Sequence, residues 1–341
     1  MTTITGWSKY RGKGAAVHAE SLMRQMELFS NFVGDKYMNI QPDAFTYNAC
    51  INAWIRSNLG VESARNAERI LQEMLQKYLS GNSNLKPNYK NFSAVINTYA
   101  KCREQSIGAK KSMDLLNQME TLHANGLKDM KPDVITYTTV IDAFSRSQLP
   151  QRSELAIKLL EKMENLYQAG EASIKPNVRT YTCVISSLMN HPQIGNDKKA
   201  QRILKKMKKM KIEPNTFTYN YVINCSASCT KGDKERKLES FKIALATFQD
   251  LCSDSNYETN SYTYAFFIKA CSNLLPITEL RLEMINYLFE QCCNQGKLSK
   301  AVLSRLINSV PRRDAQQILG STKNIRSLEL TDLPAEWSKK I

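Results

Sequence analysis

A short phrase built on proline recurs along this chain at a nearly fixed interval. In each copy proline is followed by Asp or Asn, and the copies are Gln41-Pro42-Asp43, Lys86-Pro87-Asn88, Lys131-Pro132-Asp133, Lys175-Pro176-Asn177 and Glu213-Pro214-Asn215. The prolines are separated by 45, 45, 44 and 38 residues. A regular period of this length indicates an internal repeat and is typical of solenoid proteins.

A second phrase follows each proline by about four residues. It places an aromatic residue among Thr, Asn or Ser, as in Thr46-Tyr47-Asn48, Asn91-Phe92-Ser93, Thr136-Tyr137-Thr138, Thr180-Tyr181-Thr182 and Thr218-Tyr219-Asn220. A sixth copy, Thr263-Tyr264-Ala265, follows 45 residues after Tyr219. The two phrases together define the repeat.

The apolar residues of each repeat predict two helices. The first helix begins after the Pro-Asp or Pro-Asn pair, where residues suited to capping a helix stand. Its apolar residues have helical spacing, as in Tyr47, Ile51 and Trp54. The second helix carries a stripe such as Leu71 and Met74. One hairpin cannot bury both stripes, so neighbouring hairpins must stack, and the chain is expected to form an all-α superhelical solenoid of antiparallel helix pairs.

The charge balance favours a polyanionic partner. Lys and Arg number 47 against 32 Asp and Glu, giving a net charge of +15 and a pI near 9.3. Such basicity is typical of nucleic-acid-binding proteins, although many basic proteins bind no acidic partner. No run approaches eighteen apolar residues, so no transmembrane helix and no membrane partner are expected.

The phrase at residues 131–143, Lys-Pro-Asp-Val-Ile-Thr-Tyr-Thr-Thr-Val-Ile-Asp-Ala, resembles the pentatricopeptide repeat. The resemblance implies a right-handed superhelical solenoid that binds single-stranded RNA along its first helices. The family's unit is about 35 residues, close to that of the related tetratricopeptide repeat. Most units here are longer, and the surplus falls in the loops at residues 57–63, 79–85, 125–130 and 147–153.

The resemblance divides the chain into successive units. Five are complete: 44–88, 89–133, 134–177, 178–215 and 216–260. A degenerate sixth unit spans 261–296, and residues 297–341 are expected to form a capping helix from Leu298 to Ile307 and a polar tail. Residues 1–43 read as a truncated repeat, with Ala15 to Phe32 as its second helix. The same basic, hydroxyl-rich start would also suit a transit peptide.

The resemblance also implies which residues read RNA bases. In the family, each base is read by the residue after the tyrosine together with the last residue of the same repeat. Here the pairs are Asn48 with Asn88, Ser93 with Asp133, Thr138 with Asn177, Thr182 with Asn215, and Asn220 with Asn260. The family's code then gives the tract C-G-A-A-C from 5′ to 3′. Asn260 follows Thr259 in place of proline, and Ala265 has no hydrogen-bonding group with which to read a base.

A purely structural interpretation competes with base reading at each of these positions. Asn and Asp beside proline are common turn formers, and Thr or Asn at a helix start is a common cap. Base reading is favoured because five polar pairs recur in register.

The family also uses the second residue of each first helix as an apolar wedge between bases. That position holds Phe45, Lys90, Ile135, Arg179 and Phe217. Phe45, Ile135 and Phe217 suit stacking or packing against bases. Lys90 and Arg179 depart from this apolar pattern. Arg179 can still lay its guanidinium on a base, whereas Lys90 suits a phosphate.

Motifs for catalysis are missing from the sequence. It has no Asp-rich metal cluster, no zinc-deaminase signature, no phosphate-binding G-x-x-x-x-G-K-[ST] loop and no G-x-S-x-G motif. The nine cysteines include no C-x-x-C pair, so they are interpreted as small hydrophobic residues. We expect no enzyme activity, no metal and no cofactor.

The sequence therefore predicts a monomeric single-stranded RNA-binding protein that reads about one base per repeat in organellar RNA processing, stability or translation. A mitochondrial or plastid location follows from the resemblance alone. Two alternatives stay open: a helical-repeat scaffold for a protein partner, and the targeting fragment of a larger RNA-processing enzyme.

Overall fold

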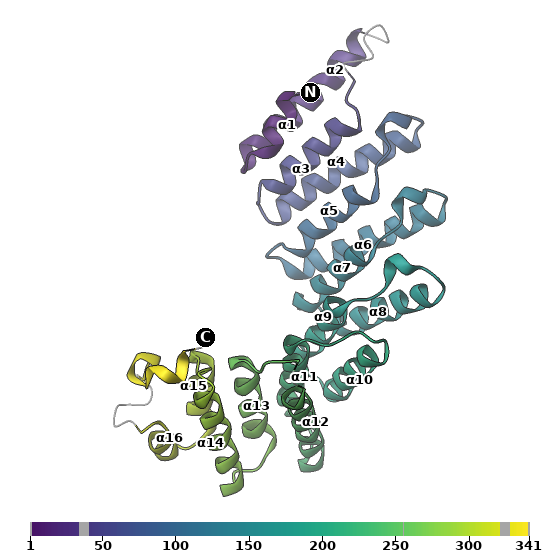
Figure 1. Ribbon diagram of the computed structural model, residues 1–341. Coiled ribbons are helices and arrows are strands. Elements are labelled where there is room, and N and C mark those ends of the chain that lie inside the picture. The colour runs from purple at the N-terminus through teal and green to yellow at the C-terminus, as the bar shows by residue number, and fades with distance from the viewer. Residues whose placement is uncertain (1, 34–40, 255, 321–327, 340–341) are drawn as a thin grey trace. The chain divides into compact units, whose positions relative to one another are not determined.

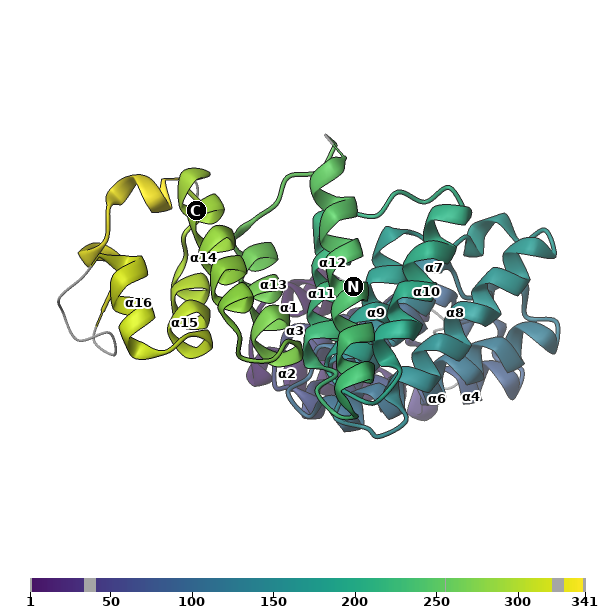
Figure 2. The same ribbon diagram turned by 90° about the horizontal axis from the view of Figure 1, so that it is seen from below.

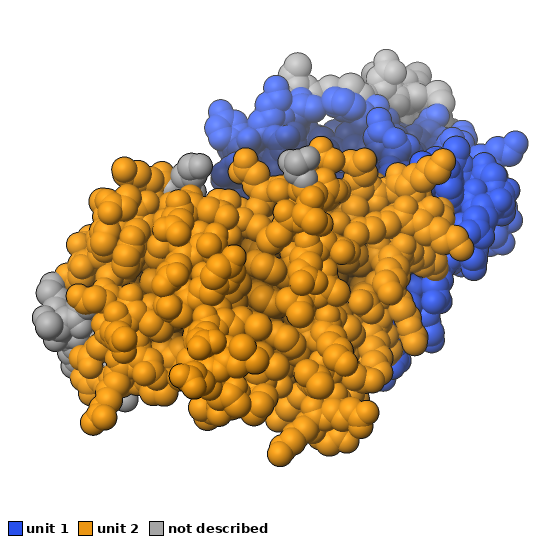
Figure 3. All heavy atoms as spheres, turned by 60° about the horizontal axis from the view of Figure 1, so that its bottom comes forward, with its two compact units in different colours: residues 1–176 blue, residues 177–341 orange. Residues whose placement is uncertain are grey.

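The structure is a computed structural model that describes residues 2–33, 41–254, 256–320 and 328–339. These residues form sixteen α-helices with short 3-10 turns and no strand (Figure 1). The all-α class predicted from the sequence is confirmed. The chain divides into two compact units, residues 1–176 and 177–341, shown in different colours in Figure 3.

Unit 1 consists of four antiparallel helix pairs. We call the first helix of a pair its A helix and the second its B helix. The pairs are α1 (Thr2–Lys9) with α2 (Lys13–Val33), α3 (Ala44–Arg56) with α4 (Val61–Leu79), α5 (Tyr89–Ala100) with α6 (Gln105–Ala124), and α7 (Val134–Arg146) with α8 (Arg152–Gln168). Each A helix contacts the next along the row α1, α3, α5 and α7, as in a solenoid.

Unit 2 repeats this arrangement. Its pairs are α9 (Val178–Met189) with α10 (Asn196–Lys209), α11 (Thr216–Ser228) with α12 (Lys234–Ser253), α13 (Ser261–Leu274) with α14 (Glu279–Asn294), and α15 (Lys300–Ser309) with α16 (Arg312–Leu319). Figures 1 and 2 both show α11, α13 and α15 side by side, in agreement with the contacts between them.

The stripes seen in the sequence form the core. Tyr47, Tyr137, Tyr181 and Tyr219 are all buried, as is Phe92 at the equivalent place in the second complete repeat. Because every A helix packs between its own B helix and the neighbouring pair, the aromatic residue four places into that helix is covered on several sides.

The long repeats of unit 1 hold their additional residues in an ordered turn. After α4, α6 and α8 the chain passes through a glycine with positive φ and then a short 3-10 helix: η2 (Ser83–Leu85), η3 (Lys128–Met130) and η4 (Ala172–Ile174). The last residue of each turn, Leu85, Met130 or Ile174, is buried. The surplus residues therefore add an apolar anchor beside each closing proline and interrupt neither helix.

The end of the chain has more structure than the sequence predicted. The expected helix from Leu298 to Ile307 is α15, but α16 follows it where a polar tail was expected. In the described part of the tail, Trp337 packs edge-on against Phe289 of α14, with their ring centroids 5.8 Å apart. The backbone carbonyl of Trp337 also accepts a hydrogen bond from the Leu298 N–H at 2.7 Å. The tail's apolar residues lack helical or strand periodicity, so the sequence alone gave no signal for this packing.

Candidate nucleic-acid interface

Every A helix from α3 to α13 begins at an Asn or Asp cap. The capping residues are Asp43, Asn88, Asp133, Asn177, Asn215 and Asn260. In each, Oδ1 accepts a hydrogen bond from the backbone N–H of the third helical residue. The structural interpretation raised from the sequence thus holds for all of them: these residues are helix caps.

Capping and base reading are compatible, because a cap occupies only one of the two polar atoms of the side chain. In Asn88 the cap occupies Oδ1 and leaves the Nδ2 amide, which can only donate. In Asp133 the cap occupies Oδ1 and leaves Oδ2, which can only accept when the carboxylate is ionised. The cap therefore fixes the side chain and determines which atom stays free.

In α5, α7 and α11, the third helical residue connects that cap to the residue after the aromatic in the preceding repeat. Ser93 and Thr136 share a hydrogen bond between their hydroxyls at 2.7 Å, and Thr136 also donates to Asp133 Oδ1 at 2.7 Å. The hydroxyls of Thr182 and Thr218 lie 2.8 Å apart. A polar cluster of three residues therefore lies where one repeat meets the next.

The predicted pairs differ in how they meet. Asn220 contacts its partner directly, with Nδ2 donating to Asn260 Oδ1 at 3.0 Å. Asn48 instead accepts a hydrogen bond from the Nδ2 of Asn91, the residue that shares a capping box with Asn88.

Of the other three pairs, two are joined through a third side chain, and one has a residue in each of the two units. Ser93 reaches Asp133 through Thr136, and Thr182 reaches Asn215 through Thr218. Thr138 belongs to unit 1 and its predicted partner Asn177 to unit 2.

The candidate wedge residues are exposed in a row of otherwise buried helices. Phe45 is 55% exposed, Ile135 68% and Phe217 57%. Lys90 and Arg179, which occupy the same position, are also exposed. Tyr262 was not predicted from the sequence. It is 54% exposed and, like Phe45 and Phe217, stands two residues before the buried tyrosine of its repeat. That register was the signal that could have found it.

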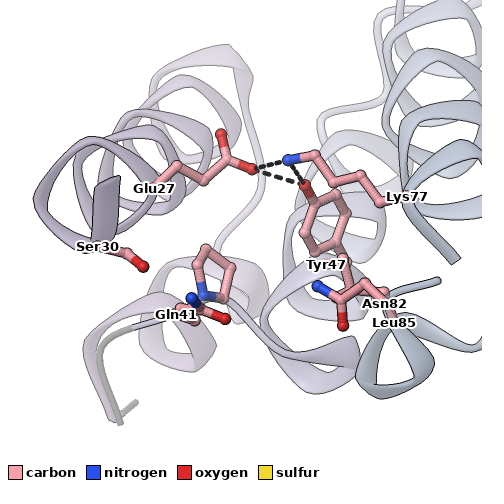
Figure 4. Close-up of a pocket in the computed structure, with 8 residues that line it drawn as sticks. Glu27, Ser30, Gln41, Tyr47, Lys77, Asn82 and Leu85 are labelled. Carbon is pink, nitrogen blue, oxygen red and sulfur yellow. Dashed lines mark hydrogen bonds and ion pairs between the residues drawn. The ribbon is translucent and has the colours of Figure 1, made fainter. Parts of the chain in front are cut away.

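Behind this interface, buried tyrosine hydroxyls meet charged side chains. Tyr47 Oη donates to Glu27 Oε1 of the preceding B helix at 2.6 Å and lies 2.7 Å from Lys77 Nζ of its own B helix. Figure 4 shows the three side chains at a pocket of about 300 Å³ that Leu85 also lines. In the same arrangement, Tyr137 donates to Glu120, and Lys162 Nζ lies 2.6 Å from that carboxylate.

The carboxylates at Tyr47 stay ionised despite partial burial. Burial alone would raise the pKa of Glu73, but hydrogen bonds from Arg24, Lys77 and Tyr47 outweigh it and lower the pKa to about 2. The same balance of burial against hydrogen bonds, chiefly from Lys77 and Tyr47, lowers the pKa of Glu27. Burial and the neighbouring Glu27 raise the pKa of Tyr47, which therefore acts as a hydrogen-bond donor.

Within the part of the chain that the structure describes, no three His, Cys, Asp or Glu side chains gather to hold a metal ion. A search of the same residues found no helix with the length and apolar character needed to cross a bilayer.

Stacked antiparallel helix pairs with capped A helices define an α-helical repeat protein. Residues 158–227 match the family model described as the pentatricopeptide repeat domain. The resemblance seen in the sequence is therefore confirmed, with the match to the family model lying at residues 158–227. No curated protein sequence matches the chain.

Solved structures give related comparisons. The chain is similar to the pentatricopeptide repeat protein PPR10 from maize, with 18% identity and a TM-score of 0.48 over 93% of this chain and 47% of that one. It is also similar to PPR10 in complex with an 18-nt psaJ RNA element, with 16% identity and a TM-score of 0.41 over 93% of this chain and 44% of that one. The chain spans less than half the length of the chains it matches.

Proposed function

We propose that this protein binds single-stranded RNA along its A helices and reads about one base per repeat. One observation carries the proposal. From α3 to α13, each A helix begins at a fixed polar cap and has an exposed side chain at its second position, which is large and apolar at Phe45, Ile135, Phe217 and Tyr262. From α3 to α11, a polar residue also follows the aromatic.

The chemistry of that arrangement matches a single strand of RNA. Exposed aromatic and branched side chains offer surfaces on which bases stack, and the fixed polar atoms between them can meet a base edge. The net charge of +15 favours the phosphate backbone. The five units from 44–88 to 216–260 each contribute one reading site in this proposal, and the tract is C-G-A-A-C.

The first test is selection from randomised RNA, followed by binding at two salt concentrations. We expect enrichment of a short tract, and a slope of log affinity against log salt of about −3.5 if five phosphates are neutralised at roughly 0.7 each. Equal affinity for duplex DNA, or the absence of any enriched sequence, would contradict the proposal.

A single substitution tests base reading within one repeat. Thr138→Asn should move the preference at one nucleotide from purine toward pyrimidine and leave the other nucleotides unchanged. Uniform weakening of the whole profile would instead assign Thr138, which is 4% exposed, a purely structural role.

In the cell, we propose that a monomer of this chain acts in organellar RNA processing, stability or translation, in a mitochondrion or plastid. The action is occlusion of the RNA or recruitment of another factor, with no catalysis by the repeats themselves. An assay for cleavage or deamination of the bound RNA tests that last point, and turnover by the purified chain would contradict it.

A second candidate, a protein-binding scaffold, is favoured by one surface. Leu280 and Tyr287 of α14 are 69% and 60% exposed, and their spacing of seven residues places them on one face of the helix. Leu280→Glu should then abolish a protein complex without changing RNA affinity. If every complex formed by the chain survives this substitution, the scaffold role loses its support.

A further inference from the structure

In α5, α7 and α11, the third helical residue bonds to two side chains assigned to base reading. One is the cap of its own helix, and the other is the residue after the aromatic in the preceding repeat, which we call the preceding reader. A hydroxyl has only one proton to give, and an amide has a donating and an accepting end. The atom that the third residue offers therefore decides which atom the preceding reader keeps free.

The cluster of Ser93, Thr136 and Asp133 shows how the proton directions are fixed. The Asp133 carboxylate only accepts, so the single hydroxyl proton of Thr136 goes to Asp133 Oδ1 at 2.7 Å. Ser93 must then donate the 2.7 Å bond to Thr136. What remains for a base is an acceptor on Ser93 and the acceptor Oδ2 of Asp133. Guanine alone places two donors, N1–H and the N2 amino group, side by side on its Watson–Crick edge.

The cluster at Asn48 has the opposite polarity. Asn91 accepts the Asn88 backbone N–H on its Oδ1 at 2.8 Å, so its Nδ2 faces Asn48 and donates to Asn48 Oδ1. The atoms that remain are the Nδ2 amides of Asn48 and Asn88, and both donate. Cytosine offers adjacent acceptors, O2 and N3, whereas uracil places the N3–H donor between its two carbonyls.

Asn220 has the same residue type at the same position, but its amide is reversed. The third residue of the next A helix is Thr263, and its hydroxyl donates to Asn260 Oδ1 at 3.2 Å. Asn220 donates from its Nδ2 to the same Asn260 Oδ1 at 3.0 Å. Its own Oδ1 is buried and has no hydrogen-bond partner among the described residues. A base donor would supply the missing bond, and both cytosine and uracil carry a donor next to an acceptor.

We infer that the third residue of each A helix is a positioning residue that sets the hydrogen-bonding polarity of the preceding reader. An asparagine there, as at Asn91, turns the preceding asparagine into a donor and selects cytosine over uracil. A threonine there, as at Thr263, turns it into an acceptor and admits both pyrimidines. The inference rests on the proposed RNA-binding function, and it places specificity at a residue that need not touch the base.

A reciprocal exchange in the full chain tests this role. Asn91→Thr gives α5 the residue found at this position in the other complete repeats, and Thr263→Asn gives α13 the residue of α5. The probes are RNAs carrying C-G-A-A-C with cytosine or uracil at the first or the fifth nucleotide. In the unmodified protein, the cytosine-to-uracil affinity ratio should be larger at the first nucleotide.

Asn91→Thr should lower the ratio at the first nucleotide by about tenfold, and Thr263→Asn should raise it at the fifth by a similar factor, the size of discrimination that a well-placed pair of hydrogen bonds gives. Thr46→Asn is the matched control. It alters the same helical position in α3, which follows no assigned reader, and should leave both ratios unchanged.

The outcomes separate the two proposals. If the unmodified protein prefers cytosine at the first nucleotide and both exchanges leave the ratios unchanged, the positioning role is wrong while RNA reading stands. If the control moves the ratios as much as the exchanges do, the effect is general to helix caps and the inference also fails. A protein that shows no base preference before any substitution overturns the proposed function and this inference together.

Discussion

Tyr47 and Tyr219 occupy the same place in their repeats, but the two B helices that supply their charged neighbours exchange roles. At Tyr47 the preceding B helix supplies the carboxylate of Glu27, and its own B helix supplies the ammonium of Lys77. At Tyr219 the preceding B helix supplies Lys208, whose Nζ lies 5.1 Å from the ring centroid, and its own B helix supplies Asp250, 3.1 Å from that Nζ.

The difference shows what the fold requires at this position. A buried phenol needs a hydrogen-bonding partner, and it can meet a carboxylate as donor or an ammonium as acceptor. The side chain from the other B helix then carries the opposite charge, as Lys77 does beside Glu27 and Asp250 does beside Lys208. Between these two repeats, the charges supplied by the two B helices have both changed sign.

The second complete repeat removes the whole arrangement. Phe92 has no hydroxyl, and Leu75 stands twelve residues before the closing proline, where Glu120 stands in the next repeat. Both are buried. An uncharged pair thus replaces the hydroxyl and the carboxylate at once, as expected when an unpaired buried charge costs more than an apolar contact.

Reversing the charge of one carboxylate beside a buried tyrosine should lower the stability of the fold more than the other changes do. Glu120→Lys places a second ammonium beside Lys162 and removes the acceptor of the Tyr137 hydroxyl. We expect a loss of about 1–3 kcal/mol in the free energy of unfolding, measured by urea denaturation. Adding Lys162→Glu recreates the order found at Tyr219 and should recover most of the loss. A double variant as unstable as the sum of its single changes would show that the two arrangements are not equivalent.

Removing the hydroxyl of Tyr47 or of Tyr219 should lower the stability of the fold by a smaller amount, and by different amounts at the two sites. The Tyr47 hydroxyl contacts Glu27, Glu73 and Lys77 at 2.6, 3.0 and 2.7 Å, so Tyr47→Phe should cost about 1–2 kcal/mol. Tyr219→Phe should cost less than half as much, because Lys208 keeps its ion pair with Asp250. The measurement is the urea midpoint of each variant, and equal losses would contradict the difference drawn between the sites.

Lowering the pH should weaken the Tyr47 site by less than either of these substitutions. The pKa of Glu73 lies below its ordinary 4.5, at about 2, so its interactions stabilise the fold above pH 4.5. That contribution is lost as the pH falls toward 2. Glu73→Gln should therefore flatten the fall of the urea midpoint between these values. Glu154→Gln, at an exposed acid on α8, is the control, and a wild-type slope in Glu73→Gln would contradict the assignment.

The sequence predicted features that depend on neighbouring residues along the chain. A helix begins after Pro-Asp because the cap accepts from an N–H three residues away, and the apolar stripes follow from helical spacing. The A helices at Ala44, Val134 and Thr216 begin immediately after the predicted caps.

Contacts between repeats were not predictable in the same way. Asn48 and Asn91 are 43 residues apart, and the direction of the Asn48 amide depends on Asn91, which lies in the next repeat. Glu27 and Lys77 lie on either side of Tyr47 in sequence, at distances that change with loop length in other repeats. No fixed spacing identifies such a cluster, so only a three-dimensional arrangement can show it.

The caps also limit how this array can be recoded. Asp133 and Asn177 begin their helices in the same way, so an exchange between Asn and Asp changes the atom offered to RNA and keeps the helix start. A residue that cannot cap would cost about 1 kcal/mol at the same position. The last residue of each repeat can therefore be replaced only by another residue that caps a helix well. Substitutions among these capping residues should change the RNA sequence that is bound and leave the helices in place.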